Sequence, residues 1–408
     1  MALNWTVPIN LTSSLFSDSF SRVAFAPDRS VYVLFNRTPS PNNALYLLKR
    51  NRAGLWLDLQ RVDNLAADSV QVDPNVNAPH GAGGEPGLQV DAAGNVHIVW
   101  IQKGFGSSPL QYSAVYRKFA FDGVNDYGTP QDKIVVANRS VAVQTVSMAV
   151  DPNDETVWFS FSADSDTLYS TYKLEGDTPG TELDTNRIDS FFTNPVSHTV
   201  RHSEHGLWVD KQSAVHAAWI LTGDDEINYT YRLAGDPKTS TENPFTKNFR
   251  AAELAVPALA SALENRFKIS LFARGLGDVS FQFQLNLTTS DECWLARRSQ
   301  IGGEWTLTRV DDTGVSNNAE AGHVLGTPSE GSLLSVHVVN GDPNSGLYYG
   351  TIVDDTLEVN LAFGFTVAGG RSASFEHGAA RLYPRTPRDL GYFNTRIGEA
   401  VVVYSKGT

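Results

Sequence analysis

The sequence predicts an all-β fold, a seven-bladed β-propeller of four-stranded antiparallel blades. A recurring phrase is the main observation, supported by turn-forming residues between short strands and by a near absence of helical segments. The phrase occurs four times, as FAPDRSVYVLF, QVDAAGNVHIVW, AVDPNDETVWFSF and WVDKQSAVHAAW. Its anchoring aspartates, Asp28, Asp91, Asp151 and Asp210, are 63, 60 and 59 residues apart. A fixed period of this size is typical of radially repeated units.

Each repeat divides into four short strands. An apolar strand such as 88–90 ends at the aspartate, and a turn such as 91–95 follows, built from residues that tolerate turn dihedrals. The second strand alternates from Val96 to Trp100, and the third is rich in tyrosine, as in 227–231. A less regular fourth segment then leads to the next repeat. This is the layout of a propeller blade.

The second half of the chain continues the pattern more faintly. Further units are expected at 261–310, 323–349 and 378–404. The first of these is expected to have a Phe-rich third strand at 279–287, and the last is expected to start with a strand at 378–383. The repeat spacing fits between six and seven units in 408 residues; we predict seven, with six as the alternative. The strand at 4–10 is expected to complete the last blade, because such a closure removes an exposed sheet edge. Residues 1–408 are then a single propeller domain.

Composition restricts the partners. Lysine and arginine number 32 against 45 acidic residues, a net charge of −13, which argues against nucleic acid or an anionic membrane as the partner. The single cysteine, Cys293, forbids an intramolecular disulfide. No apolar run is long enough for a membrane helix. The segment MALNWTVPINLTSS lacks signal-peptide features. We therefore expect synthesis in the cytoplasm, with the virion or the extracellular space as places reached by another route.

Two of these phrases resemble those of the sialidase-like propellers with BNR-type repeats. They are VDAAGNVHIVW and SQIGGEWTLTRV, and the second keeps the Ser, Gly and Trp of the Asp-box at Ser299, Gly303 and Trp305, with Ile301 in place of its Asp. The resemblance implies a propeller with sugar-binding loops. Sialidases also use an arginine triad, a tyrosine nucleophile with its glutamate, and an acidic aspartate, and the sequence assigns none of these roles to a residue.

Polar residues gather just before the expected first strands, where a propeller presents loops at the mouth of its central channel. Histidine with carboxylate could perform acid–base chemistry there, and arginine could hold an acidic sugar. Polar loops that merely face solvent are the alternative. The candidate ligand-binding residues are His80, Glu85, Arg201, His202, His205, His323, Glu376, His377 and Arg381.

Aromatic residues supply a second set of candidates. Tyr112, Tyr229, Tyr231 and Trp305 could stack on sugars, although core packing explains most such rings. His97 and His216 occupy the position of Tyr32 and Trp158 in the other repeats, which predicts ring packing with one buried hydrogen bond rather than metal binding. No metal-ligand or cofactor spacing is present. Asp-rich turns leave calcium open, and turn chemistry explains them equally.

The sequence therefore favours a non-catalytic propeller for recognition or assembly, binding a glycan or a protein. This interpretation fits a lectin-like adhesin or a virion component such as a phage tail protein. It also fits a subunit of a larger complex. The alternative is a glycan-active enzyme, a sialidase-like hydrolase or a polysaccharide lyase, with its site at the channel mouth. A protein-interaction hub is a third reading, which an apolar surface patch would distinguish.

Overall fold

The structure of the protein is a computed structural model. It describes residues 9–11, 17–38, 44–63, 86–103, 112–137, 143–163, 167–173, 185–187, 199–222, 226–233, 247–253, 270–286, 291–299, 303–310, 318–326, 333–340, 346–353, 356–364, 370–377, 390–396 and 402–407. Within these ranges the regular elements are all strands. None of the described segments is a helix long and apolar enough to cross a bilayer.

The first four repeats each form one antiparallel sheet, which we call the first to fourth blades. The first blade contains β2 (Ser17–Phe25), β3 (Val31–Thr38), β4 (Ala44–Arg50) and β5 (Gln60–Arg61). The second contains β6 (Gly87–Val90), β7 (Val96–Lys103), β8 (Tyr112–Ala120), β9 (Thr129–Pro130) and β10 (Ile134–Ala137). The third contains β11 (Val143–Val150), β12 (Val157–Ala163), β13 (Thr167–Lys173) and β14 (Thr185–Arg187). The fourth contains β15 (Thr199–Val209), β16 (Val215–Thr222), β17 (Glu226–Arg232) and β18 (Lys247–Glu253).

The remaining strands form two sheets. The eight-stranded sheet contains β19 (Ser270–Gly275), β20 (Asp278–Asn286), β21 (Asp291–Arg298), β22 (Thr306–Arg309), β23 (Asn318–Gly326), β24 (Leu333–Asn340), β25 (Gly346–Val353) and β26 (Thr356–Gly364). The last sheet contains β27 (Gly370–His377), β28 (Leu390–Arg396), β29 (Val402–Gly407) and β1 (Ile9–Asn10).

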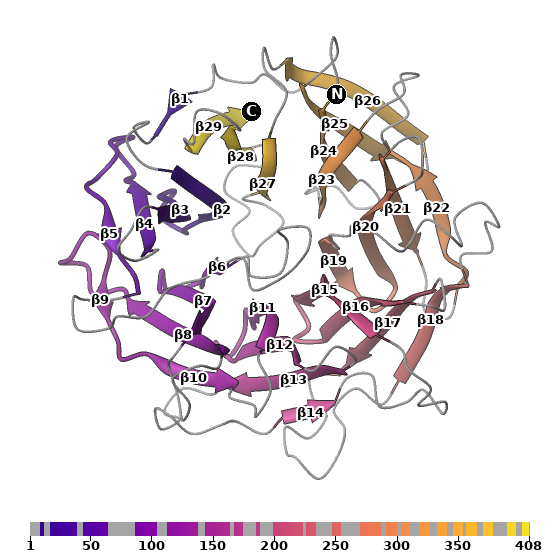
Figure 1. Cartoon of the computed structure of the whole chain (residues 1–408), viewed down its shortest axis with the longest axis horizontal. Coiled ribbons are helices and arrows are strands. Elements are labelled where there is room, and N and C mark those ends of the chain that lie inside the picture. The colour runs from indigo at the N-terminus through magenta and orange to yellow at the C-terminus, as the bar shows by residue number, and fades with distance from the viewer. Residues whose placement is uncertain are drawn as a thin grey trace.

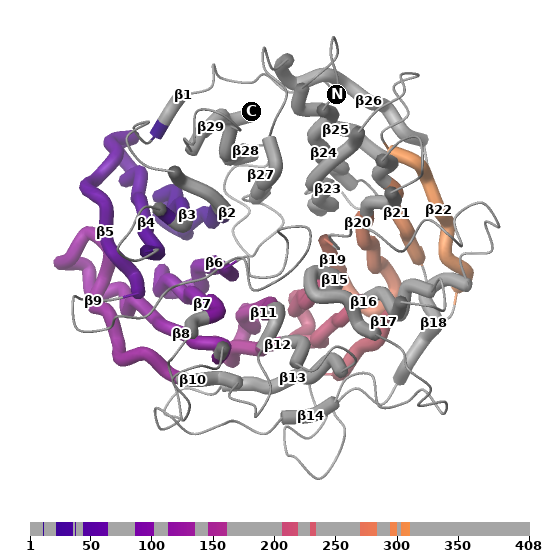
Figure 2. Tube along the Cα trace, viewed as in Figure 1, coloured from indigo at the N-terminus to yellow at the C-terminus, as the bar shows by residue number. Residues whose placement is uncertain are grey.

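The sheets are arranged in a ring around a central axis, as Figure 1 shows, and the Cα trace of the first three blades follows its left and lower side (Figure 2). The strands that begin the units contact one another in cyclic order around this axis, as β2, β6, β11, β15, β19, β23, β27 and again β2. The expected amino-terminal closure is present, because β1 pairs with β29 through Ile9↔Tyr404 and Asn10↔Val403. The protein is thus an all-β, propeller-like ring.

The sequence predicted seven four-stranded sheets, but the hydrogen bonding does not divide the chain in this way. The described strands form six sheets, of which four have four strands, one has five and one has eight. The eight-stranded sheet arises because a single parallel bridge, Asp291↔Asn318, joins β21 to β23. The second blade has a fifth strand because β9 pairs beside β10 on β8.

The later units also lie in different places from those predicted. The Phe-rich strand near 279–287 is the second strand of its unit, β20, because it pairs directly with β19. The innermost strand of the last unit is β27, which ends at His377, whereas the sequence placed it at 378–383. Its sequence, GRSASFEH, has few apolar residues, so hydrophobic patterning did not identify it.

The hydrophobic core lies between neighbouring blades. One cluster joins Ala24, Tyr32 and Leu34 of the first blade to Leu88 and Ile98 of the second. A second cluster joins the second blade to the third, and another joins the fourth to the β19–β22 half of the eight-stranded sheet. Because successive side chains of a strand point to opposite faces, each blade is buried on both sides. Strands buried on both faces read as near-continuous apolar runs, and β7 is buried from Val96 to Ile101.

Candidate functional site

The two faces of the ring are distinguished by which ends of the innermost strands lie there. Every unit repeats the same meander from the axis outwards, so the innermost strands run in one direction along the axis. Their carboxyl ends carry the repeated aspartate turns at 26–30, 91–95, 151–156 and 210–214, and we call this side the turn face. The side where the innermost strands begin is the entry face.

On the turn face, each aspartate closes its own turn. Asp91 Oδ1 accepts the Asn95 backbone N–H at 2.7 Å, and Asp210 Oδ1 accepts that of Ala214 at 2.9 Å. Asp28 is held by the N–H and the hydroxyl of Ser30, at 2.8 and 2.9 Å. The sequence prediction of aspartate-based turns is therefore confirmed in detail.

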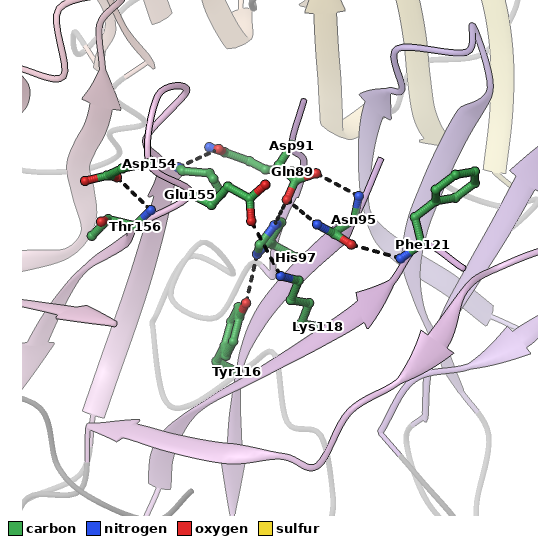
Figure 3. A network of polar contacts seen from close by, with 11 residues as sticks. Gln89, Asp91, Asn95, His97, Tyr116, Lys118, Phe121, Asp154, Glu155 and Thr156 are labelled. Carbon is green, nitrogen blue, oxygen red and sulfur yellow. Dashed lines mark hydrogen bonds and ion pairs between the residues drawn. The ribbon is translucent and has the colours of Figure 1, made fainter. Parts of the chain in front are cut away.

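In the second and fourth blades the second carboxylate oxygen binds a histidine. His97 Nε2 lies 3.1 Å from Asp91 Oδ2, and His97 Nδ1 lies 2.8 Å from the Tyr116 hydroxyl (Figure 3). His216 repeats this arrangement, at 3.0 Å from Asp210 and 2.7 Å from the Tyr229 hydroxyl. We call each set an Asp–His–Tyr triad.

Both triads are closed to solvent. The exposed fractions of His97 and His216 are 1% and 0%, and those of Asp91 and Asp210 are 3% and 2%. An ionised carboxylate can only accept, so Nε2 carries the proton and the tyrosine O–H donates to Nδ1. Burial lowers the pKa of His216 below 6.5 against the opposing effect of Asp210, and burial raises the pKa of the Tyr229 hydroxyl. The predicted packing role of these rings is confirmed, with two hydrogen bonds where one was expected.

The candidate mouth residues that the structure describes do not all lie at the same end of the innermost strands. Arg201 and His202 lie near the start of β15, toward the entry face, and His205 lies in the middle of that strand. His323 lies within β23 rather than before it, and Glu376 and His377 end β27 on the side of the turn face. His80, Glu85 and Arg381 lie outside the described residues.

Backbone irregularities mark the entry half of several innermost strands. In β15 the register shifts between Val200 and His205, a stretch that includes Arg201 and His202. In β23 it shifts between Glu320 and His323. Bulges of this kind re-aim side chains and are frequent beside active sites. Two of the predicted histidines, His205 and His323, therefore stand where the ladder resumes after a bulge.

The same position in the first blade holds Arg22, which the sequence analysis did not single out. The register of β2 shifts between Ser19 and Arg22. Arg22 is half-buried, and it lies two residues before Ala24, which packs against Leu88 of the second blade. By strand alternation Arg22 lies on the same side, toward the second blade. Burial lowers the pKa of Arg22 to about 10, so the side chain stays charged at neutral pH.

The aromatic candidates occupy different environments. Tyr229 and Tyr231 are 0% and 5% exposed, so their rings belong to the core and are not open to a sugar. Trp305 is half-buried and packs on Phe281 and Tyr229, with ring centroids 4.9 and 5.5 Å apart. Tyr112 is the first residue of β8. Among the described residues, no three His, Cys, Asp or Glu side chains are grouped as metal ligands.

No protein-family model and no curated protein matches this sequence. Solved structures do share its fold. The polysaccharide lyase Uly1 is similar with a TM-score of 0.57 at 9% identity, covering 99% of each chain. An ulvan lyase of a polysaccharide lyase family, bound to an oligosaccharide of glucuronic acid and sulfated rhamnose, gives 0.58 at 11%, covering 98% of this chain and 96% of its own. A Hadza microbial sialidase gives 0.43 at 9%, covering 95% and 65%. The likeness is one of fold.

Proposed function

We propose that this protein is a glycan-active enzyme, a polysaccharide lyase that acts on acidic chains at the entry face. One observation carries the proposal: the fold matches those of two polysaccharide lyases over nearly the whole of both chains, with TM-scores of 0.57 and 0.58. This favours the alternative that the sequence left open over the non-catalytic reading. Fold alone does not set chemistry, so the residues of the entry face must supply it.

The entry face carries the residue types that an elimination needs. A base removes the proton from the carbon beside a uronate carboxylate, the electron pair forms a double bond, and the bond to the neighbouring sugar oxygen breaks as that oxygen is protonated. We assign binding of the substrate's uronate carboxylate to Arg22, because a guanidinium binds carboxylates in a fixed fork. His202 and His205, at the bulge of β15, are the candidate base and acid.

The test is an activity screen on the full-length chain. Uronate-containing, neutral and sialylated glycans are each incubated with the protein, followed by ultraviolet absorbance for unsaturated products and by assay of released sialic acid. New absorbance with uronate chains supports the proposal. Sialic acid release would instead establish a hydrolase. Binding without any turnover would return the protein to the non-catalytic reading.

Variants test which face of the ring carries the catalytic activity. Arg22→Gln and His202→Gln are expected to lower kcat/KM on the order of tenfold or more, the cost of losing a charge-assisted contact or a proton-transfer group. Arg52→Gln is the matched control, because Arg52 is exposed in the β4–β5 connection on the turn face. Equal effects of all three variants would contradict the assignment to the entry face.

We further propose that the ring has seven blades in one domain spanning residues 1–408. The eight-stranded sheet then counts as two blades, β19–β22 and β23–β26, joined only by the bridge Asp291↔Asn318. The cyclic contacts of seven innermost strands support this division. An experimental structure with these two halves packed face to face would agree with it, whereas a continuous flat sheet would not.

A further inference from the structure

The two Asp–His–Tyr triads reach across blade boundaries. The ring of Tyr116 meets Phe159 of the third blade edge-on, with centroids 5.3 Å apart at 71°. The ring of Tyr229 meets Trp305, beside β22, at 5.5 Å and the same angle. Each triad therefore connects the aspartate turn of one blade to an aromatic ring of its neighbour.

Charged groups surround the two histidines differently. His216 faces Asp210, Tyr229 and the guanidinium of Arg298, which lies 5.0 Å from the centre of the Tyr229 ring. Tyr231 pairs opposite His216 on β17.

His97 faces Asp91 and Tyr116, and it pairs opposite Lys118 on β8. Lys118 in turn lies 3.9 Å from Glu155 of the third-blade turn (Figure 3). In the fourth-blade triad an arginine, Arg298, lies over the ring of the tyrosine.

A second proton on the histidine would reverse one hydrogen bond of the triad. Nδ1 accepts from the tyrosine hydroxyl, so a protonated Nδ1 must donate to the tyrosine oxygen instead, and the buried O–H loses this acceptor. In the fourth blade, burial lowers the pKa of His216 against the effect of Asp210, and Arg298 lowers it further. Protonation therefore requires acid and opposes the folded arrangement.

We propose that the fourth-blade triad is an acid-sensitive latch, which holds the fourth blade to β19–β22 and opens when His216 is protonated. The first and third blades carry Tyr32 and Trp158 at the same position, so their turns lack the titrating ring. This inference is independent of the proposed glycan chemistry.

Amide hydrogen exchange on the full-length protein tests the proposal. The reporter is the turn amide of Ala214, which donates to Asp210 at 2.9 Å, and the internal control is the turn amide of Ser30, which donates to Asp28 at 2.8 Å in the first blade. Protection is expressed relative to the intrinsic rate at each pH. Between about pH 7 and about pH 5, protection of Ala214 should fall by up to about tenfold per pH unit, while that of Ser30 holds. An equal change in both turns would overturn the proposal.

Variants separate titration from loss of packing. His216→Phe keeps a ring but cannot titrate, so the pH dependence at Ala214 should disappear. Trp158→Phe changes the equivalent ring of the third blade and should lower amide protection in the third-blade turn at all pH values, without adding a pH dependence. Tyr229→Phe removes the hydroxyl that donates to Nδ1, so the pH dependence at Ala214 should be weaker than in the unmodified protein, even if the variant is less stable. A pH slope that survives in His216→Phe would contradict the latch.

Discussion

Residues 97 and 216 show how much one position of a repeat can vary. Both histidines make the same two hydrogen bonds and stack on their tyrosine with centroids 6.0 Å apart at 27°. Trp158, at the same position of the third blade, is instead covered by the Arg232 guanidinium, 4.7 Å from its ring. An aromatic ring is thus the shared requirement, and the polar partners follow from which ring is present.

Two glycines of the β8–β9 connection give a residue-scale prediction. Gly123 and Gly128 both have positive φ, at 69° and 79°, but a Cβ on Gly128 would lie 2.5 Å from the Ala120 carbonyl oxygen, whereas one on Gly123 meets nothing within 4 Å. Gly128→Ala should therefore lower the free energy of unfolding by about 2–3 kcal/mol and Gly123→Ala by only about 1 kcal/mol. Urea denaturation measures both. Equal losses would show that φ alone sets the cost.

Arg22 was not predicted from the sequence, for a reason that lies in its local sequence. The segment SFSRVAF contains no motif, and a lone arginine in a strand is usually a solvated residue. Only the register shift before Arg22 and its burial single it out. By contrast, His97 and His216 could be interpreted correctly because the repeat aligned them with Tyr32 and Trp158. Alignment within the chain supplied information that a single position lacks.

At the scale of elements, the side chain of Gln89 acts as an extra pairing group between two blades. Its Nε2 donates to the Met148 carbonyl and its Oε1 accepts from the Val150 N–H, both at 2.9 Å. Gln89 is 8% exposed. One amide thereby satisfies two backbone groups of β11, in addition to the apolar contacts between the blades.

Gln89→Glu should make stability depend on pH. The carboxylate keeps the bond from Val150 but opposes the Met148 carbonyl oxygen, so burial should raise its folded pKa above the usual value of about 4.3. Because the folded state then binds the proton more tightly, the free energy of unfolding should rise as pH falls through that raised pKa. Gln89→Leu is the control, which should lose about 3 kcal/mol at every pH. A flat pH profile for Gln89→Glu would refute the shared role of the amide. Urea midpoints across the pH range provide the measurement.

The elements themselves were predictable where the turn chemistry was explicit. The strands of the first four units follow the aspartate turns closely, as β6 and β7 do around Asp91. Units without this aspartate gave no such marker. The β19–β20 connection is a tight hairpin that reads as one Phe-rich run, so β20 was assigned to the wrong place in its unit. Register is set by pairing with neighbours far along the chain, and a local pattern does not contain it.

For the whole molecule, closure of the ring involves β1, of which the structure describes two residues. β1 pairs with β29 through Ile9 and Asn10, on the outside of the sheet that contains the carboxyl-terminal strands. The sequence predicted this closure from an isolated apolar strand and from the cost of an open edge. The number of hydrogen-bonded sheets was not predictable in the same way, because the single bridge Asp291↔Asn318 merges two units.

Removing residues 1–10 should therefore weaken the ring as a unit. The outer edge of β29 would lose its partner, which should lower the Tm by a few degrees and promote edge-to-edge association. Removing residues 1–8 is the matched control, because it keeps Ile9 and Asn10 and so the pairing with Tyr404 and Val403. Thermal unfolding and static light scattering compare the two truncations with the full-length chain. If both behave like the full-length chain, β1 does not close the ring, and contacts such as those between β27 and β2 must hold its two ends together.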